Sequence, residues 1–512
     1  MTRAWRPGHD PRAVRHPGAP GRPGPVERPT VVVAGGGIAG IAAAVGLAER
    51  GVGVVLVEPQ EQLGGRVRSW PVDHAGDQVT MSRGFHAFFR QYYNLRALLR
   101  RVDPSLSALT PVGDYPLVLA DGHADSFAKI PRTPPLNMAA FVAQSPSFSA
   151  RDLAAVDIPA ALELLDVEFP QTFSDYDGES AAAFLDRLNF PVGARHLALE
   201  VFARSFFAHP DDFSAGELVG MFHTYFLGSS EGLLFDVPNQ DYDTAFWGPL
   251  GRYLHSLGVE VRTGTSVTGV ELTGSGVTVG LSDGELEAAA VVLATDPGST
   301  RRLLLDLELG DDDYRSRVEA VTTAPPFAVW RLWLDRLVDA ERAPFLGTSG
   351  YGPLDNITVV DRFEAGAAEW AAAHGGSVVE LHAYALPEPV VEADVRARLR
   401  AELDRVYPEL TGAGVVAEEW LVQQDCPLSS HTRWLDRLTV DTPDPRVLLA
   451  GDGIRCDYPV ALMERAATTG FLAANQILAD HALPGHDLWT VPMASRHPVA
   501  GRMRTALSRL AS

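Results

Sequence analysis

Thr30-Val-Val-Val-Ala-Gly-Gly-Gly-Ile-Ala-Gly40 is the stretch of this 512-residue sequence that decides its fold. The apolar, mostly β-branched residues 30–34 are typical of a buried parallel strand, and the glycines after them precede an alanine-rich helix expected over residues 41–50. A second apolar run at residues 52–57 predicts another strand, which ends at Glu58. This order of strand, glycine turn, helix and strand predicts the βαβ unit of a nucleotide-binding fold.

The glycines of this turn have the spacing G-x-G-x-x-G, at Gly35, Gly37 and Gly40. The first glycine permits a tight bend, the second lets the backbone approach a pyrophosphate, and the third lets helix and strand pack closely. The amino end of the helix favours the anion. Glu58 stands where a carboxylate can accept a hydrogen bond from a ribose hydroxyl. A purely structural turn is the alternative, but this context favours a dinucleotide site.

Two further motifs favour FAD over NAD as the dinucleotide. Gly64, Gly65 and Arg66 follow shortly after the second strand, and an exposed glycine backbone beside an arginine suits the diphosphate of an extended flavin dinucleotide. Late in the chain, Gly451 permits close approach to a ligand and Asp452 can accept from ribityl hydroxyls. Each motif alone is compatible with an ordinary surface turn. Their occurrence in this order predicts FAD, bound non-covalently.

The chain returns to this nucleotide-binding lobe after long insertions, so we expect an α/β fold with a Rossmann-like FAD-binding domain and a discontinuous α+β substrate domain. Strand patterns at residues 258–262, 267–272, 289–295 and 446–450 and a helix at 461–481 mark the returns. The predicted segments are a disordered Arg/Pro-rich tail at 1–28, the FAD-binding domain at 29–120, 246–305 and 440–483, the substrate domain at 121–245 and 306–439, and a basic C-terminal tail at 484–512.

Composition excludes several classes of function. A formal net charge of -22 argues against nucleic acid as a partner, because phosphates need clustered Lys and Arg. Two cysteines allow no disulfide framework, so a reducing, cytoplasmic location is expected. No apolar run is long enough for a transmembrane helix. Residues 496–512 combine arginines with apolar residues at helical spacing, which predicts either a peripheral contact with the inner face of a membrane or a solvated tail.

Together, the three glycine motifs resemble the amine oxidase and phytoene desaturase superfamily, from about residue 30 to residue 482. The resemblance implies two lobes, with FAD extended across the first and the substrate entering over the flavin ring. It also implies that Val267 contacts the adenine end of the cofactor through its backbone.

Less generic segments resemble the carotenoid β-ring desaturase/methyltransferases, the isorenieratene synthase type. Met81-Ser-Arg-Gly-Phe-His-Ala-Phe-Phe-Arg-Gln-Tyr-Tyr-Asn-Leu-Arg96 and Val460-Ala-Leu-Met-Glu-Arg-Ala-Ala-Thr-Thr-Gly470 carry this resemblance, together with residues 226–232 and 375–382. It implies an apolar carotene as substrate, with β-carotene expected, whose β-ring becomes aromatic while one methyl group moves. It also implies cofactor contacts for Arg83 and Met463. The electron acceptor that reoxidises the flavin is left open.

Five aromatic residues recur at helical spacing: Phe85, Phe88, Phe89, Tyr92 and Tyr93. The spacing predicts one aromatic face of a helix. This face is either an ordinary core stripe or the wall of an apolar pocket beside the flavin. Aromatic faces suit the implied chemistry, because each stabilises a nearby positive charge by about 0.5–2 kcal/mol.

The implied chemistry also needs a base to take protons from the ring. His86 and Glu464 are the candidates, because both lie in the family-like segments. A structural histidine is the alternative for His86, and a helix-start or ion-pair role with Arg465 is the alternative for Glu464. Cys426 lacks the glycine-rich context of cysteines that tether FAD. No metal site is expected, since the histidines and cysteines show no ligand spacing.

Two other classes of function remain open at this point. One is a different flavin oxidase, such as an amine oxidase or an acyclic carotene desaturase. The other is a non-catalytic escort-type protein with the same fold, against which the retention of both Gly64-Gly65-Arg66 and Gly451-Asp452 argues.

Overall fold

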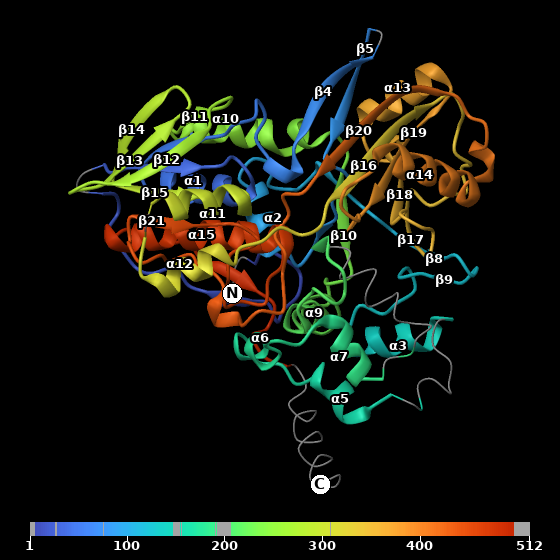
Figure 1. The fold of residues 1–512 in the computed structure, drawn as a ribbon, viewed down its shortest axis with the longest axis horizontal. Coiled ribbons are helices and arrows are strands. Elements are labelled where there is room, and N and C mark those ends of the chain that lie inside the picture. Colours follow the sequence, from blue (N-terminus) through green and yellow to red (C-terminus); the bar gives the residue numbers. More distant parts are fainter. Residues whose placement is uncertain are drawn as a thin grey trace, which may run out of the picture.

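The computed structural model describes residues 6–25, 28–74, 76–146, 154, 156–189, 191, 206–307 and 309–495. They form two lobes (Figure 1). The first contains a parallel sheet and the second a larger, mainly antiparallel sheet, with a group of short helices below the second lobe in this view. Within the described ranges, no helix is both long enough and apolar enough to cross a lipid bilayer.

The first lobe is built on a parallel sheet with strand order β11-β3-β2-β15-β21. Its strands are β2 (Thr30–Ala34), β3 (Gly53–Val57), β11 (Glu260–Arg262), β15 (Ala290–Leu293) and β21 (Val447–Leu449). The central strands are buried runs of valine and alanine, as a sheet covered on both faces requires. Parallel pairing brings the carboxyl ends of all these strands to one edge, where ligands of such sheets bind.

Helices α1 (Ile38–Ala48) and α15 (Leu462–Asp480) pack along each other beside this sheet. Small side chains permit the close approach: a methyl group on Gly470 would lie 2.2 Å from the carbonyl oxygen of Ala39. The remaining elements of the first lobe are α2 (Tyr93–Leu99), α10 (Gly248–Ser256), α11 (Pro297–Asp306), α12 (Asp312–Glu319) and the antiparallel strands β12 (Val267–Leu272), β13 (Val277–Leu281) and β14 (Gly284–Ala288).

The second lobe is built on a sheet with strand order β20-β16-β19-β18-β17-β8-β9. Its strands are β8 (Leu117–Leu119), β9 (Ala124–Asp125), β16 (Phe327–Leu334), β17 (Phe345–Ser349), β18 (Asn356–Val359), β19 (Ser377–Ala383) and β20 (Val415–Gln423). Strands β16 and β19 are buried along their whole length. Helices α13 (Ala365–His374) and α14 (Glu392–Val406) supply apolar side chains to its cores.

Shorter elements lie between the lobes or below the second one (Figure 1). They are the hairpin β4 (Ser69–His74) and β5 (Asp77–Ser82), the sheet of β6 (Phe88–Phe89), β10 (Phe235–Pro238) and β7 (Leu109–Pro111), and the helices α3 (Leu136–Gln144), α5 (Ile158–Glu163), α6 (Gln171–Asp175), α7 (Ala181–Arg187) and α9 (Ala215–Phe222). Single turns are 3₁₀ helices η1 (Gly65–Val67), η7 (Val360–Arg362), η8 (Pro408–Leu410) and η9 (Trp434–Asp436), and π-helices η5 (His223–Leu227) and η6 (Asp243–Trp247).

The predicted disorder of residues 1–28 is wrong for residues 6–25. Strand β1 (Val14–His16) pairs antiparallel with β22 (Leu488–Thr490), a strand inside the predicted C-terminal tail. The side chain of Asp10 is buried and accepts a hydrogen bond from the backbone amide of Ser230 at 2.7 Å. Composition alone misses this order, because the partners lie far away in the sequence. The predicted basic helix at 496–512 lies outside the described residues.

The fold class is confirmed, and most first-lobe elements lie where their sequence patterns predict them. Strands β2 and β12 have the predicted bounds, and the other predicted strands and helices are shifted by one to three residues at their ends. Two elements lie on the other side of the predicted domain boundaries. Strand β8, predicted to belong to the FAD-binding domain, pairs with β17 in the sheet of the second lobe. Helix α12, predicted to belong to the substrate domain, packs in the first lobe.

Candidate active site

A cavity of about 800 Å³ lies between the two lobes, at the carboxyl edge of the parallel sheet. Most residues predicted to bind the cofactor line it: Gly35, Gly37, Glu58, Gly64, Gly65, Arg66, Arg83, Val267, Gly451, Asp452 and Met463. Of the two predicted bases, His86 lines the cavity, whereas the lining does not include Glu464. Segments more than 400 positions apart thus meet around one site.

The glycine turn leaves room for a ligand at one position and none at another. A methyl group added to Gly37 would have Gly65 Cα, 3.8 Å away, as its nearest neighbour outside the turn, so the space beside it belongs to the cavity. A methyl group on Gly40 would lie 1.8 Å from the carbonyl oxygen of Gly35. Gly40 therefore serves the packing of helix on strand, and Gly37 marks the place where a pyrophosphate fits at the amino end of α1.

Gly35, Gly37, Gly64 and Gly65 line one part of the cavity, the glycine cradle, and Glu58 lies at its far end. One carboxylate oxygen accepts a hydrogen bond from the Gly36 amide at 2.7 Å, and the other accepts from the Gln60 amide at 2.9 Å. Burial raises the pKa of Glu58, opposed by these two amide donors. The amides hold the carboxylate at the end of β3. The Thr265 amide, two positions before Val267, donates to the Glu58 carbonyl oxygen at 3.1 Å, so Glu58 and Val267 line neighbouring parts of the cavity, which suits a ribose hydroxyl at the adenine end.

Two arginine–aspartate pairs line the other half of the cavity. Arg66 donates to both oxygens of Asp452, which joins the turn after β3 to the segment after β21. Arg83 donates to both oxygens of Asp425, at 2.7 and 2.5 Å. Burial would raise the pKa of Asp425, but Arg83 holds it below its usual value. These two-pronged pairs give fixed polar groups for the diphosphate and ribityl part of a flavin dinucleotide.

Cys426 lines the cavity next to these pairs and is a free, buried thiol. Burial raises its pKa to about 11, despite the arginines nearby. A thiol that keeps its proton is a poor nucleophile. This environment supports non-covalent cofactor binding, which remains a prediction.

Aromatic side chains form the part of the cavity beyond the glycine cradle. Phe85 stacks on Phe345 with ring centres 4.4 Å apart, and Tyr115 stacks on Phe127 at 4.6 Å. Phe235 lies between these pairs, 6.1 Å from Phe85 and 4.8 Å from Tyr115. The residues come from the second lobe and from the shorter segments beside it, and their faces make a wall suited to an apolar, conjugated ligand.

The helix predicted for the aromatic stripe is wrong. Phe88 and Phe89 form strand β6, which pairs with β10, and α2 begins only at Tyr93. Phe85, Phe89 and Tyr92 nevertheless line the cavity, while Phe88 and Tyr93 are buried in apolar clusters. Phe85, Phe89 and Tyr92 therefore match the prediction of a pocket wall, and Phe88 and Tyr93 match the prediction of a core stripe.

His86 faces the cavity in a defined protonation state. Its Nδ1 lies 2.8 Å from the carbonyl oxygen of Gly84, an acceptor, so Nδ1 carries the proton of the neutral ring. Burial lowers the pKa of His86 to about 4. The neutral ring therefore keeps the lone pair on Nε2, the state that a base requires.

Glu464 lies in α15 with its carboxylate turned to the start of α2. Its two oxygens accept from the backbone amides of Asn94 at 2.8 Å and Leu95 at 2.9 Å. Burial raises the pKa of Glu464 to about 8, against the effect of these donors. The geometry favours a structural role, the capping of a helix start, in place of the predicted base. The alternative of an ion pair with Arg465 is not observed among the described residues: Arg465 binds Glu217 instead, at 2.7 Å.

Several cavity residues escape prediction from the sequence. Asp425 and Phe327 interact with Arg83, the first by an ion pair and the second through its ring at 5.6 Å. Tyr384 and Phe345 lie on strands of the second lobe or beside them. These residues belong to the long insertion 306–440, where no local motif marks them. The sequence offers one signal only: polar residues within apolar runs that are expected to form buried strands.

Comparison with known proteins agrees with this geometry. The model of the family described as flavin containing amine oxidoreductase matches residues 38–478. A carotenoid phi-ring synthase of Streptomyces griseus is 52% identical over 507 residues, which cover 98% of each chain. A carotenoid phi-ring synthase of Chlorobaculum tepidum is 28% identical and covers 90% of each chain.

Solved structures of amine oxidases share the fold. Putrescine oxidase bound to putrescine matches with a TM-score of 0.64 at 15% identity, over 88% of this chain and 99% of that one. Cyclohexylamine oxidase from Brevibacterium oxydans matches with a TM-score of 0.63 at 14% identity, over 89% and 99%. At these identities the likeness concerns the fold alone.

The glycine cradle, the polar pairs and the family match define an FAD-dependent oxidoreductase, and the chain belongs to the flavin-containing amine oxidoreductase family. Within this family it is a member of the carotenoid ring desaturase/methyltransferases, on the strength of 52% identity over the whole chain.

Proposed function

We propose that this protein converts the β-ring of a carotene, β-carotene in the first place, into an aromatic ring by two desaturations and one 1,2-methyl migration. The observation that carries the proposal is the continuity of the aromatic wall with the glycine cradle, in a chain similar over its whole length to a phi-ring synthase. An oily ring fits such a wall, because it offers apolar contact and no unpaired charge.

The residues of the cavity have distinct tasks in this proposal. Gly37, Glu58 and the Arg66–Asp452 pair would hold FAD across the first lobe. Bound FAD supplies the acceptor for the hydride that each desaturation removes. Phe85 and Phe345 orient the substrate ring and exclude water from it. Their faces stabilise positive charge on the ring by about 0.5–2 kcal/mol each, which favours migration of a methyl group to the neighbouring carbon.

His86 is the base in this scheme. Loss of a ring proton to Nε2 gives the new double bond, and the neutral state of the histidine at ordinary pH makes the lone pair available. Each desaturation removes two hydrogens, so one converted ring loses four hydrogens and keeps every carbon. The methyl group moves within the molecule, so no methyl donor enters the reaction.

Co-expression with a β-carotene pathway tests the proposal. The expected product is lighter than β-carotene by four hydrogens per converted ring, and its NMR spectrum shows aromatic methyl groups. A Gly37→Val variant is the control, because it removes the space for the pyrophosphate and should give unchanged carotene. A product that has gained a carbon refutes the migration. Unchanged β-carotene, together with turnover of an acyclic polyene or an amine, assigns the chain to a different flavin oxidase reaction.

A further inference from the structure

A second, much smaller cavity lies behind His86. Its volume is about 20 Å³, enough for one water molecule. His86 and Phe85 line both cavities, so the imidazole forms part of the wall that separates them. The large cavity is aromatic at this wall, whereas the small one is bordered by Tyr242, Arg331, Glu364 and Glu380. This placement connects the candidate base to a cluster of buried charges.

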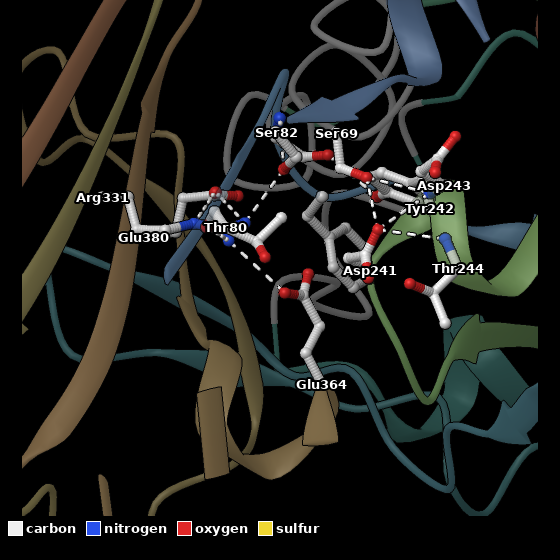
Figure 2. A network of polar contacts seen from close by, with 12 residues as sticks. Ser69, Thr80, Ser82, Asp241, Tyr242, Asp243, Thr244, Arg331, Glu364 and Glu380 are labelled. Atoms are coloured by element: carbon white, nitrogen blue, oxygen red, sulfur yellow. Dashed lines mark hydrogen bonds and ion pairs between the residues drawn. The ribbon is translucent and has the colours of Figure 1, made fainter. Parts of the chain in front are cut away.

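The cluster is centred on Arg331 of β16 (Figure 2). Its guanidinium donates to Glu380 at 2.8 and 2.9 Å, to the Ser82 hydroxyl at 2.9 Å, and to the backbone carbonyl of Thr80 at 2.7 Å. Glu364 is a more distant partner, at 3.4 Å. Arg331 is thus neutralised mainly by Glu380, and the carboxylate of Glu364 keeps capacity for another donor.

Tyr242 bridges the base and this cluster. Its hydroxyl donates to the carbonyl oxygen of Gly84 at 2.9 Å, the same oxygen that accepts from His86 Nδ1. The hydroxyl lies 3.4 Å from Nδ1 itself. Tyr242 and Glu364 both border the small cavity. A water there would have polar partners on several sides, as an ordered buried water requires.

We propose that the small cavity is a proton exit, through which the proton that His86 takes from the substrate ring passes to Glu364. The inference rests on the proposed function, because it concerns the base of that reaction. Glu364 is a relay residue that touches neither substrate nor cofactor, and acts through His86.

Nε2 of neutral His86 receives the ring proton, and the imidazolium releases its Nδ1 proton to the Tyr242 oxygen or to one water. That carrier passes a proton to the Glu364 carboxylate, which becomes neutral. Glu364 then loses its proton to solvent, to which 12% of its side chain is exposed, against 1% for Glu380. Once the product has left, Nε2 gives its proton to water that enters the large cavity and Nδ1 takes one from solvent through the same carrier, which restores the starting tautomer.

The charges that face Glu364 suit it for this task. Burial raises its pKa to about 7, with Arg331 opposing and Glu380 and Asp241 adding to the rise. Glu380 differs: burial would raise its pKa, but Arg331 lowers it to about 2, so Glu380 stays ionised. Of the two carboxylates at the small cavity, only Glu364 can gain and lose a proton near neutral pH.

Glu364→Gln tests the relay, because glutamine keeps the shape but cannot carry the proton. In purified, FAD-loaded wild type, the rate of ring conversion should rise with pH through about 7, as Glu364 becomes free to accept. In Glu364→Gln the rate should no longer rise with pH in this range, and above pH 7 it should be about tenfold or more below the wild-type rate. Glu364→Asp keeps a carboxylate and should keep the rise of the rate with pH. FAD absorbance should be unchanged in all of them.

Asp361→Asn is the matched control. Asp361 lies three positions earlier, burial raises its pKa too, and it binds the Val378 amide without bordering the small cavity. Its replacement should leave rate and pH profile unchanged. Infrared difference spectra between each variant and wild type give a readout without turnover, because they cancel the bands of the other carboxyls, among them Glu464 with its pKa of about 8. A protonated carboxyl band that titrates near pH 7 should be lost in Glu364→Gln, shifted in Glu364→Asp and retained in Asp361→Asn.

Two failures are distinguishable. Wild-type protein that makes no aromatic-ring product refutes the proposed function. The relay is refuted if wild-type protein makes the aromatic-ring product and the Glu364→Gln variant shows the same rate and the same rise of the rate with pH. Should Glu364→Gln not fold, the infrared difference spectrum between Glu364→Asp and wild type decides: if it shows no band that titrates near pH 7, the titrating carboxyl is not Glu364, which overturns the relay.

Discussion

Replacing Gly37 by alanine should separate cofactor binding from folding. Gly37 has φ near −77°, a conformation that alanine adopts without strain, and the new methyl group would have its nearest neighbour 3.8 Å away. The stability of the apoprotein should therefore change by no more than about 1 kcal/mol. Gly40→Ala should behave in the opposite way, because its methyl group would overlap a backbone oxygen at 1.8 Å. We expect a loss of about 3 kcal/mol or more there.

The effect of Gly37→Ala on FAD follows from the same geometry. The methyl group enters the space assigned to the pyrophosphate, and crowding by one methyl group costs about 1–3 kcal/mol. Since about 1.4 kcal/mol corresponds to a factor of ten, Kd for FAD should rise about 5- to 150-fold. The assay is a titration of apoprotein with FAD, followed by flavin fluorescence, beside thermal melting of the same apoprotein.

Gly366→Ala is the control for this experiment. Gly366 lies in α13, and a methyl group there would meet nothing within 4 Å. It should leave FAD affinity unchanged. Wild-type affinity in folded Gly37→Ala would refute the assignment of the cradle. So would a loss of apoprotein stability in Gly37→Ala equal to that in Gly40→Ala.

Further predictions concern the two candidate bases and the chain ends. His86→Phe should retain FAD but slow ring conversion about 100-fold or more. The free energy of unfolding of wild-type protein should fall as the pH drops from 6.5 towards about 4, because His86 binds a proton in the unfolded chain but not when it is buried. Denaturation measured at several pH values should show a smaller fall in His86→Phe. Glu464→Gln should lower the free energy of unfolding by about 1–3 kcal/mol, because one amide of α2 loses its acceptor. The variant should still carry out the reaction. A variant that is as stable as wild type but inactive would instead identify Glu464 as the base. Asp10→Asn should lower the melting temperature, whereas neighbouring Arg12→Ala, whose contact is made by the backbone amide, should not. Removing residues 496–512 should reduce co-sedimentation with anionic liposomes, and equal sedimentation of both forms would reject the tail as a membrane contact.

Contiguous motifs account for what could be predicted. Strand β2 and the glycine turn are specified by neighbours in the sequence, so their bounds and their place at the cavity follow from local patterns. The same holds for Gly451 and Asp452 after β21.

Long-range pairing accounts for the features that could not be predicted from the sequence. The stripe from Phe85 to Tyr93 has helical spacing, yet β10 pairs with Phe88 and Phe89 and draws them into a strand. Asp425 lies 342 positions from Arg83 and carries no motif of its own. The helix cap made by Glu464 depends on α2, more than 360 positions away. In each case tertiary contacts override or complete a local pattern.

The most direct test of the central claim follows a labelled methyl group. Purified, FAD-loaded protein is given β-carotene whose geminal methyl carbons carry ¹³C, and the product is examined by NMR. The account predicts an aromatic ring that retains both labels, with one on the original ring carbon and the other on its neighbour. Loss of a label, or a product in which both labels still share one carbon, would contradict it.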